Sequence, residues 1–73
     1  MEEFIENFYA ILEDTEKNEI NHNTDYKSLD EWDSMTTLMI IAMVDEKYGK
    51  QIIAVDFKES LTLENLYTRI QSK

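Results

Sequence analysis

The chain has 73 residues, a formal net charge of −9 from 16 acidic and 7 basic residues, and no cysteine. The absence of cysteine excludes disulfide bridges, thiolate metal sites and cysteine nucleophiles. Strong negative charge disfavours binding to nucleic acid or anionic membranes. It favours protein partners with basic patches or serves solubility alone. The length predicts a single domain over residues 1–73, with enough apolar residues (42%) for a core.

Neither a targeting signal nor a membrane span is predicted. The N-terminus, Met1-Glu2-Glu3, is acidic where a signal peptide would be basic. The longest apolar run, Leu38 to Val44, is too short to cross a bilayer. We therefore expect a cytoplasmic protein that acts away from membranes.

The first predicted helix covers residues 2–14. Its apolar side chains recur at helical spacing and form one face: Phe4, Ile5, Phe8, Ile11 and Leu12. Residues 15–32 are predicted to form a long loop, because their Asn, Thr and Asp side chains compete for backbone hydrogen bonds. Such a loop needs its own anchors in the core. The candidates are Ile20, Tyr26, Leu29 and Trp32.

The second predicted helix covers residues 34–48. Asp33 or Ser34 is expected to cap its start, and Gly49, the single glycine, is expected to end it in a left-handed conformation. The run from Leu38 to Val44 is apolar at every position and therefore covers all sides of the helix. A bundle of this size cannot bury every side, so part of this apolar surface should face outward.

The C-terminal third predicts two further helices. The alternation in Gln51 to Phe57 would also suit a strand, but a lone strand has no partner, which favours a loop and a short helix around 56–59. Thr62 is expected to cap a last helix with a regular apolar face. The predicted fold is all-α, a small bundle of three main helices and one short helix, with a long loop between the first two.

Few residues offer catalytic chemistry. His22, the only histidine, lies in the polar loop with no acid or nucleophile beside it in sequence, which predicts an exposed and inert side chain. The chain lacks a His/Cys/Asp cluster for a transition metal and a glycine-rich phosphate loop. Adjacent carboxylates are expected to form a solvated face. We predict neither an enzyme nor a metal site.

Ser34 is the exception, because it opens the apolar helix directly after Trp32 and Asp33. A hydroxyl at this position is expected to be exposed. A helix N-terminus also offers free N–H groups and partial positive charge, which suit an attached phosphate. From its position alone, Ser34 is either an ordinary helix cap or a modification site.

The segment Leu29 to Gly49, LDEWDSMTTLMIIAMVDEKYG, resembles the region around the modified serine of acyl carrier proteins. The usual family motif, Asp-Ser-Leu, corresponds here to Asp33-Ser34-Met35. Length, acidity and the order of the predicted helices extend the resemblance over nearly the whole chain. It implies a four-helix carrier fold.

The resemblance also implies a function. A separate phosphopantetheinyl transferase would move 4′-phosphopantetheine from coenzyme A onto the Ser34 hydroxyl, next to Asp33, and the thiol of this cofactor would carry acyl groups as thioesters. The protein itself would be a monomer that presents the cargo to acyl-loading and acyl-processing enzymes. Family members often shelter the acyl chain between their helices. The candidates for lining such a cavity are Phe8, Leu12, Ile40, Ile41, Val44, Tyr48, Leu66 and Ile70.

Two departures from the family pattern suggest a specialised pathway rather than general fatty-acid synthesis. Glu31-Trp32 precedes Asp33, a form similar to that of freestanding carriers of secondary or surface-molecule pathways, and Met39 stands where an acidic residue is usual. The expected partner-binding face is therefore partly apolar, and methionine suits adaptable binding surfaces. It comprises Met35, Leu38, Met39 and Ala42, with Asp45 and Glu46 beyond them.

Two other interpretations remain open from the sequence. Carriers of aminoacyl, D-alanyl or peptidyl groups share the fold and the serine, and only the loaded group distinguishes them. A non-modified helical interaction module would use the exposed side of helix 34–48 to dock or dimerise. In that case Ser34 would be a cap and nothing more.

Overall fold

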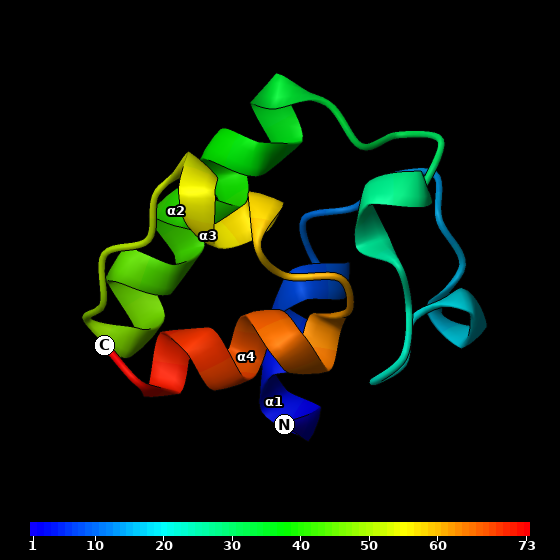
Figure 1. Ribbon diagram of the computed structural model, residues 1–73. Coiled ribbons are helices and arrows are strands. Elements are labelled where there is room, and N and C mark those ends of the chain that lie inside the picture. The colour runs from blue at the N-terminus through cyan, green and yellow to red at the C-terminus, as the bar shows by residue number, and fades with distance from the viewer.

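The computed structural model describes residues 1–73, and its regular structure is entirely helical. The α-helices are α1 (Glu2–Tyr9), α2 (Ser34–Tyr48), α3 (Ala54–Lys58) and α4 (Leu63–Gln71). Two single 3₁₀ turns, Lys17–Glu19 and Tyr26–Ser28, lie in the long connection between α1 and α2 (Figure 1). The prediction of an all-α bundle with three longer helices and one short helix is confirmed. No helix has both the length and the apolar character that a membrane span requires.

Helix α2 has the predicted bounds, residues 34 to 48. The sequence could predict them because neighbouring residues cap both ends of the helix. The Asp33 side chain accepts a hydrogen bond from the Thr36 amide at 2.8 Å. At the other end Gly49 has a φ of 65°, the left-handed conformation in which a side chain would be strained. The Gly49 amide donates to the carbonyl oxygen of Asp45 at 3.1 Å and closes the last turn.

Helix α1 ends five residues before the predicted boundary at residue 14. The amides of Ile11 and Leu12 form tighter turns with carbonyls three residues back. The next two amides, of Glu13 and Asp14, donate to the side chain of Glu31 instead of to helix carbonyls. The helix therefore stops where a contact from the distant loop takes over its hydrogen bonds.

The first turn of α4 is held by its own cap and by the long loop. Thr62 Oγ1 accepts from the Asn65 amide at 3.2 Å, which confirms the predicted cap. The Leu63 amide donates to the carbonyl of Thr24, and the Glu64 amide donates to the carbonyl of His22. These carbonyls satisfy N–H groups that a helix start leaves unpaired.

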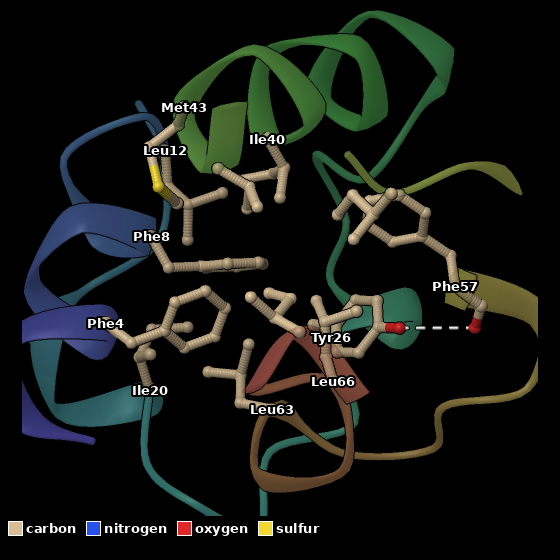
Figure 2. Packing of buried hydrophobic residues seen from close by; sticks show 13 residues of the cluster. Phe4, Phe8, Leu12, Ile20, Tyr26, Ile40, Met43, Phe57, Leu63 and Leu66 are labelled. Atoms are coloured by element: carbon tan, nitrogen blue, oxygen red, sulfur yellow. Dashed lines mark hydrogen bonds between the residues drawn. The ribbon is translucent and has the colours of Figure 1, made fainter. Parts of the chain in front are cut away.

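The core is one cluster of 13 buried apolar residues to which all four helices and the long loop contribute (Figure 2). The loop supplies Ile20 and Tyr26, which are buried, and Leu29 and Trp32 pack partly buried against the cluster. All four anchors predicted for the loop are thus in place.

Tyr26 makes the most extensive of these loop contacts. Its ring lies 5.0 to 6.2 Å, between centroids, from the rings of Phe8, Trp32 and Phe57. Its hydroxyl is 3.2 Å from the carbonyl oxygens of both Phe57 and Ser60, and it donates to this pair of acceptors. Burial raises the pKa of Tyr26, which keeps the hydroxyl protonated as a donor. One side chain thereby joins the loop to α1 and to the segment between α3 and α4.

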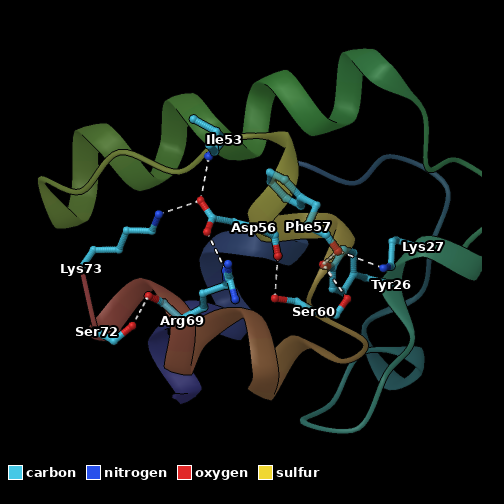
Figure 3. A network of polar contacts seen from close by, with 9 residues as sticks. All are labelled: Tyr26, Lys27, Ile53, Asp56, Phe57, Ser60, Arg69, Ser72 and Lys73. Atoms are coloured by element: carbon cyan, nitrogen blue, oxygen red, sulfur yellow. Dashed lines mark hydrogen bonds and ion pairs between the residues drawn. The ribbon is translucent and has the colours of Figure 1, made fainter.

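An ion pair network around the buried side chain of Asp56 joins α3 to α4 and the C-terminus (Figure 3). The Asp56 carboxylate is 2% exposed and lies 2.6 Å from Arg69 Nε and 2.9 Å from Lys73 Nζ. It also accepts from the Ile53 amide at 2.8 Å, at the start of α3. Burial by itself would raise the pKa of Asp56, but the hydrogen bonds from Lys73, Ile53 and Arg69 outweigh it and lower the pKa to about 2. The predicted short helix around 56–59 begins earlier, at Ala54, because this carboxylate caps it.

Replacing Tyr26 with phenylalanine removes the hydroxyl and keeps the ring. We expect the free energy of unfolding, measured by urea denaturation, to fall by about 1 kcal/mol, because a buried hydrogen bond is lost. Tyr67→Phe is the matched control, since Tyr67 is only partly buried and should tolerate the change. Equal effects of the two substitutions would contradict the anchoring role of the Tyr26 hydroxyl.

The Asp56 network predicts a specific dependence of stability on pH. The folded pKa of about 2 lies below the ordinary value of 3.8, so the ionised carboxylate stabilises the fold above pH 4, and this contribution is lost as pH falls toward 2. The difference in unfolding free energy between the wild type and Asp56→Asn should therefore narrow by about 2 kcal/mol from pH 6 to pH 2. Asp45→Asn is the control at an exposed position. The difference in unfolding free energy between the wild type and this variant should not narrow over the same pH range.

Candidate functional site

Ser34 is the first residue of α2 and is exposed. The hydrogen bonds at this end of the helix join Thr36 to Asp33 and Glu31 and Thr37 to Asp33, and none of them involves the Ser34 hydroxyl. Figure 1 shows α2 starting at the top of the molecule, at the end opposite to the N-terminus of α1. The hydroxyl is therefore open to a large reactant.

Asp33 takes the capping role that the sequence left open between Asp33 and Ser34. Its backbone is extended, with φ −149° and ψ −175°. Its carboxylate accepts from the Thr36 amide, and its carbonyl oxygen accepts from both the amide and the hydroxyl of Thr37 at 3.0 Å. Hydrogen bonding from Thr36 lowers the pKa of Asp33, so the carboxylate stays charged next to Ser34. The serine hydroxyl is not needed for capping and remains available for chemistry.

Glu31 is the supporting residue that the sequence analysis missed. Its carboxylate accepts from the amides of Glu13 and Asp14, at 2.7 and 2.9 Å, and from the hydroxyl of Thr15. The hydroxyl of Thr15 contributes most to lowering the pKa of Glu31, followed by the Glu13 amide. The carbonyl of Glu31 also accepts from Thr36 Oγ1 at 3.1 Å, inside the first turn of α2. Glu31 thus ties the segment after α1 to the start of α2. In the sequence Glu31 stands out only as part of the segment before Ser34, and no local pattern predicts the contacts of its carboxylate with residues 13–15.

The predicted partner-binding face of α2 lies on the surface. The side chains of Met35, Leu38 and Met39 are 62%, 60% and 40% exposed. The other three members, Ala42, Asp45 and Glu46, are exposed as well. The structure adds an apolar group that was not predicted, near α3. It consists of Ile53, Val55 and Leu61, which are all exposed.

The candidates for an acyl-chain cavity all belong to or adjoin the core. Six of them are buried and the other two are partly buried: Phe8, Leu12, Ile40, Val44, Leu66 and Ile70, then Ile41 and Tyr48. Tyr48 accepts a hydrogen bond from Asn7 Nδ2 at 3.2 Å, and burial raises its pKa. These side chains pack against one another, and sheltering of a chain among them remains a prediction.

His22 has an acidic neighbour that its sequence position did not predict. Its Nδ1 lies 3.4 Å from a carboxylate oxygen of Glu64, and both side chains are about half exposed. The two residues meet because the His22 carbonyl accepts the Glu64 amide at the start of α4. No group of three His, Cys, Asp or Glu side chains is arranged to hold a metal ion.

A covalently attached cofactor needs a reachable nucleophilic atom rather than a preformed pocket. Ser34 Oγ meets this requirement, since it is exposed and free of intrachain hydrogen bonds. Asp33 and Glu31 fix the backbone on either side of Trp32, so the hydroxyl has a defined position. The start of α2 therefore offers one accessible hydroxyl oxygen to which a group could be attached.

Comparison with protein-family models, with curated proteins and with solved structures finds no match to this chain.

The anchoring by Glu31 predicts a local effect on backbone dynamics. In Glu31→Ala the amides of Glu13 and Asp14 lose their acceptor, so we expect their hydrogen exchange to accelerate at least about tenfold while core amides of α2 stay protected. Asp30→Ala is the matched control, because Asp30 is an exposed acidic neighbour. Unchanged exchange of the two amides in Glu31→Ala would contradict the anchoring.

Proposed function

We propose that this chain is an acyl carrier protein with Ser34 as the attachment point for 4′-phosphopantetheine. The observation that carries the proposal is the exposed Ser34 hydroxyl, which opens α2 while Asp33 provides the cap. The sequence Asp33-Ser34-Met35 is similar to the carrier motif, and the all-helical bundle is compatible with it. The cofactor would supply a thiol on a flexible arm that holds the cargo as a thioester.

The attachment step would require a partner enzyme, since the Asp33 carboxylate is engaged as the helix cap and its low pKa makes it a weak base for Ser34. The only histidine of the chain pairs with Glu64 at the start of α4. A phosphopantetheinyl transferase would take up the Ser34 proton while Oγ bonds to the pantetheine-bearing phosphorus of coenzyme A. The pyrophosphate P–O bond breaks, and adenosine 3′,5′-bisphosphate leaves with the electron pair. The carrier's contribution is the position and exposure of the oxygen.

Acyl-loading and acyl-processing enzymes would bind the exposed side of α2. Met35, Leu38 and Met39 offer an apolar surface next to the modified residue. Flexible thioether side chains adapt to differently shaped partners, which suits a carrier that visits several enzymes in turn. Asp45 and Glu46, one to two turns further along α2, add charge at the far edge of this face.

Two other functions are also consistent with an exposed Ser34 and an exposed apolar side of α2. A carrier of aminoacyl, D-alanyl or peptidyl groups would use the same serine and differ only in the thioester found on the protein from its native cell. A non-modified interaction module is favoured by the exposed apolar side chains of α2 alone. Modification of Ser34 separates the carriers from this module.

Intact mass measurement tests the proposal. Incubating the chain with coenzyme A, magnesium and a broad-specificity phosphopantetheinyl transferase should add one phosphopantetheine to the wild type and none to Ser34→Ala. Ser28→Ala is the matched control and should be modified normally, because Ser28 is an exposed serine bonded to Asp25 in the loop. An unmodified wild type, or addition that survives Ser34→Ala, would refute the carrier function.

A further inference from the structure

Four aromatic rings link α1, the long loop and α3 across the interior of the bundle. We call them the ring cluster, and its members are Phe8, Tyr26, Trp32 and Phe57. The rings of Phe8 and Trp32 are stacked, with 6.1 Å between their centroids and 6° between their planes. The centroid of Trp32 also lies 5.0 Å from that of Tyr26 and 5.8 Å from that of Phe57. Figure 2 shows Phe8 and Phe57 pointing into the interior from opposite sides.

Hydrogen bonds hold the loop against α3 around the ring cluster (Figure 3). The Tyr26 hydroxyl lies 3.2 Å from the carbonyl oxygens of Phe57 and Ser60. Lys27 Nζ donates to the same Phe57 carbonyl at 2.9 Å. Moving α3 away from the loop would break these hydrogen bonds in addition to the ring contacts, and would leave polar groups without partners. Two kinds of interaction therefore keep the cluster closed.

The ring cluster lies where an arm on Ser34 would meet the interior. Trp32 precedes Ser34 by two residues, and its amide donates to the carbonyl of Leu29 at 3.0 Å. Its neighbours Glu31 and Asp33 are held by the segment after α1 and by the first turn of α2. A displacement of Trp32 with its backbone would disturb both of these contacts.

Toward the other end of α2 the interior is filled as well. The Phe4 ring lies 6.1 Å, between centroids, from the rings of Phe8 and Tyr48. Six of the eight side chains that could line an acyl cavity are buried. Five surface hollows, of about 270 to 490 Å³, are lined by residues other than these eight. A filled interior accommodates inserted methylene groups only with strain.

We propose that the cargo of this carrier is a short or polar acyl group, which stays in solvent on the arm because the ring cluster closes the interior to it. A long apolar chain gains free energy by leaving water, and the gain grows with each methylene group, so its carrier needs an interior that opens. A short chain, or one with hydroxyl or carboxyl groups, gains little from burial. This inference rests on the proposed function and specifies the class of its substrate. Sheltering between the helices, which the resemblance implies, is the competing outcome.

A series of acyl lengths on the same protein tests the inference. The transferase would load the wild type from acetyl-, butyryl-, octanoyl- and dodecanoyl-coenzyme A in separate reactions, and intact mass would verify each product. Hydroxylamine then cleaves the thioester of each loaded chain. Dividing its rate by the rate on the coenzyme A thioester of the same acyl group leaves a ratio that reports access to the thioester.

We expect this ratio to vary less than about twofold over the series, since the interior stays closed and every thioester stays in solvent. The urea midpoint of unfolding should not rise with acyl length, because a group that does not bind the folded interior does not stabilise it. The fluorescence of Trp32, the only tryptophan, should be independent of acyl length as well.

Removing one ring should admit the cargo. Phe57→Ala opens space beside Trp32 and keeps the backbone carbonyl to which Tyr26 and Lys27 donate. We expect the octanoyl thioester of this variant to be at least about fivefold less reactive than its acetyl thioester, because the space left takes up methylene groups. Val55→Ala is the matched control in the same helix, with a side chain 48% exposed, and should behave as the wild type.

Circular dichroism checks the fold of both variants, and the wild-type series decides alone if Phe57→Ala unfolds. Protection or stabilisation that increases with acyl length in the wild type would overturn the inference and leave the carrier function standing. An octanoyl thioester equally reactive in folded Phe57→Ala and in the wild type would overturn the ring cluster as the barrier. A wild type modified neither from these donors nor from coenzyme A itself would overturn the carrier function too.

Discussion

The structure depends on Tyr26 holding the long loop in the core. The connection between α1 and α2 contains only two single turns of regular structure, so its path is not fixed by its own backbone hydrogen bonds. Ring packing on Phe8, Trp32 and Phe57, together with a hydroxyl that bonds across to the α3–α4 segment, supplies the missing constraint. Without this anchor, the order of more than twenty residues would depend on the smaller core contacts of Ile20, Leu29 and Trp32 and on the loop's hydrogen bonds to α4 and to the end of α1.

The anchored loop in turn decides how Ser34 is presented. Glu31 binds the segment after α1, and Asp33 caps α2, so two carboxylates hold the backbone that leads into Ser34. Each carboxylate remains ionised because neutral donors stabilise its charged form. The same two side chains thus serve the fold and give the Ser34 end of the molecule its negative charge.

The net negative charge and the exposed apolar surface of α2 belong to different parts of the chain. The loop and α1 hold the net charge, and α2 offers exposed methionines and a leucine of low polarity. Charged surfaces speed the encounter of two proteins, while apolar contact holds them together once docked. In the proposed carrier, which would bind and release several enzymes in turn, this division would permit fast association without very tight complexes.

Local sequence determined the features whose causes lie within a few residues. Asp33 and Gly49 set the ends of α2, Thr62 starts α4, and the unbroken apolar run predicted that α2 would expose part of its surface. Such caps act through hydrogen bonds or backbone conformations of neighbouring residues, so a short segment contains all the information. The exposure of Ser34 follows from the same local cap.

The tertiary structure decided the features that join distant residues. Helix α1 stops at Tyr9 because Glu31, 17 residues beyond Asp14, takes the amides that would have continued it. Helix α3 starts at Ala54 because Asp56, buried under Arg69 and Lys73, caps it. A surface hollow lined by Ile11, Glu31 and Met39, which come from three separate segments, has the same origin. Each contact joins side chains that periodicity and capping rules treat separately, so only the folded chain could bring them together.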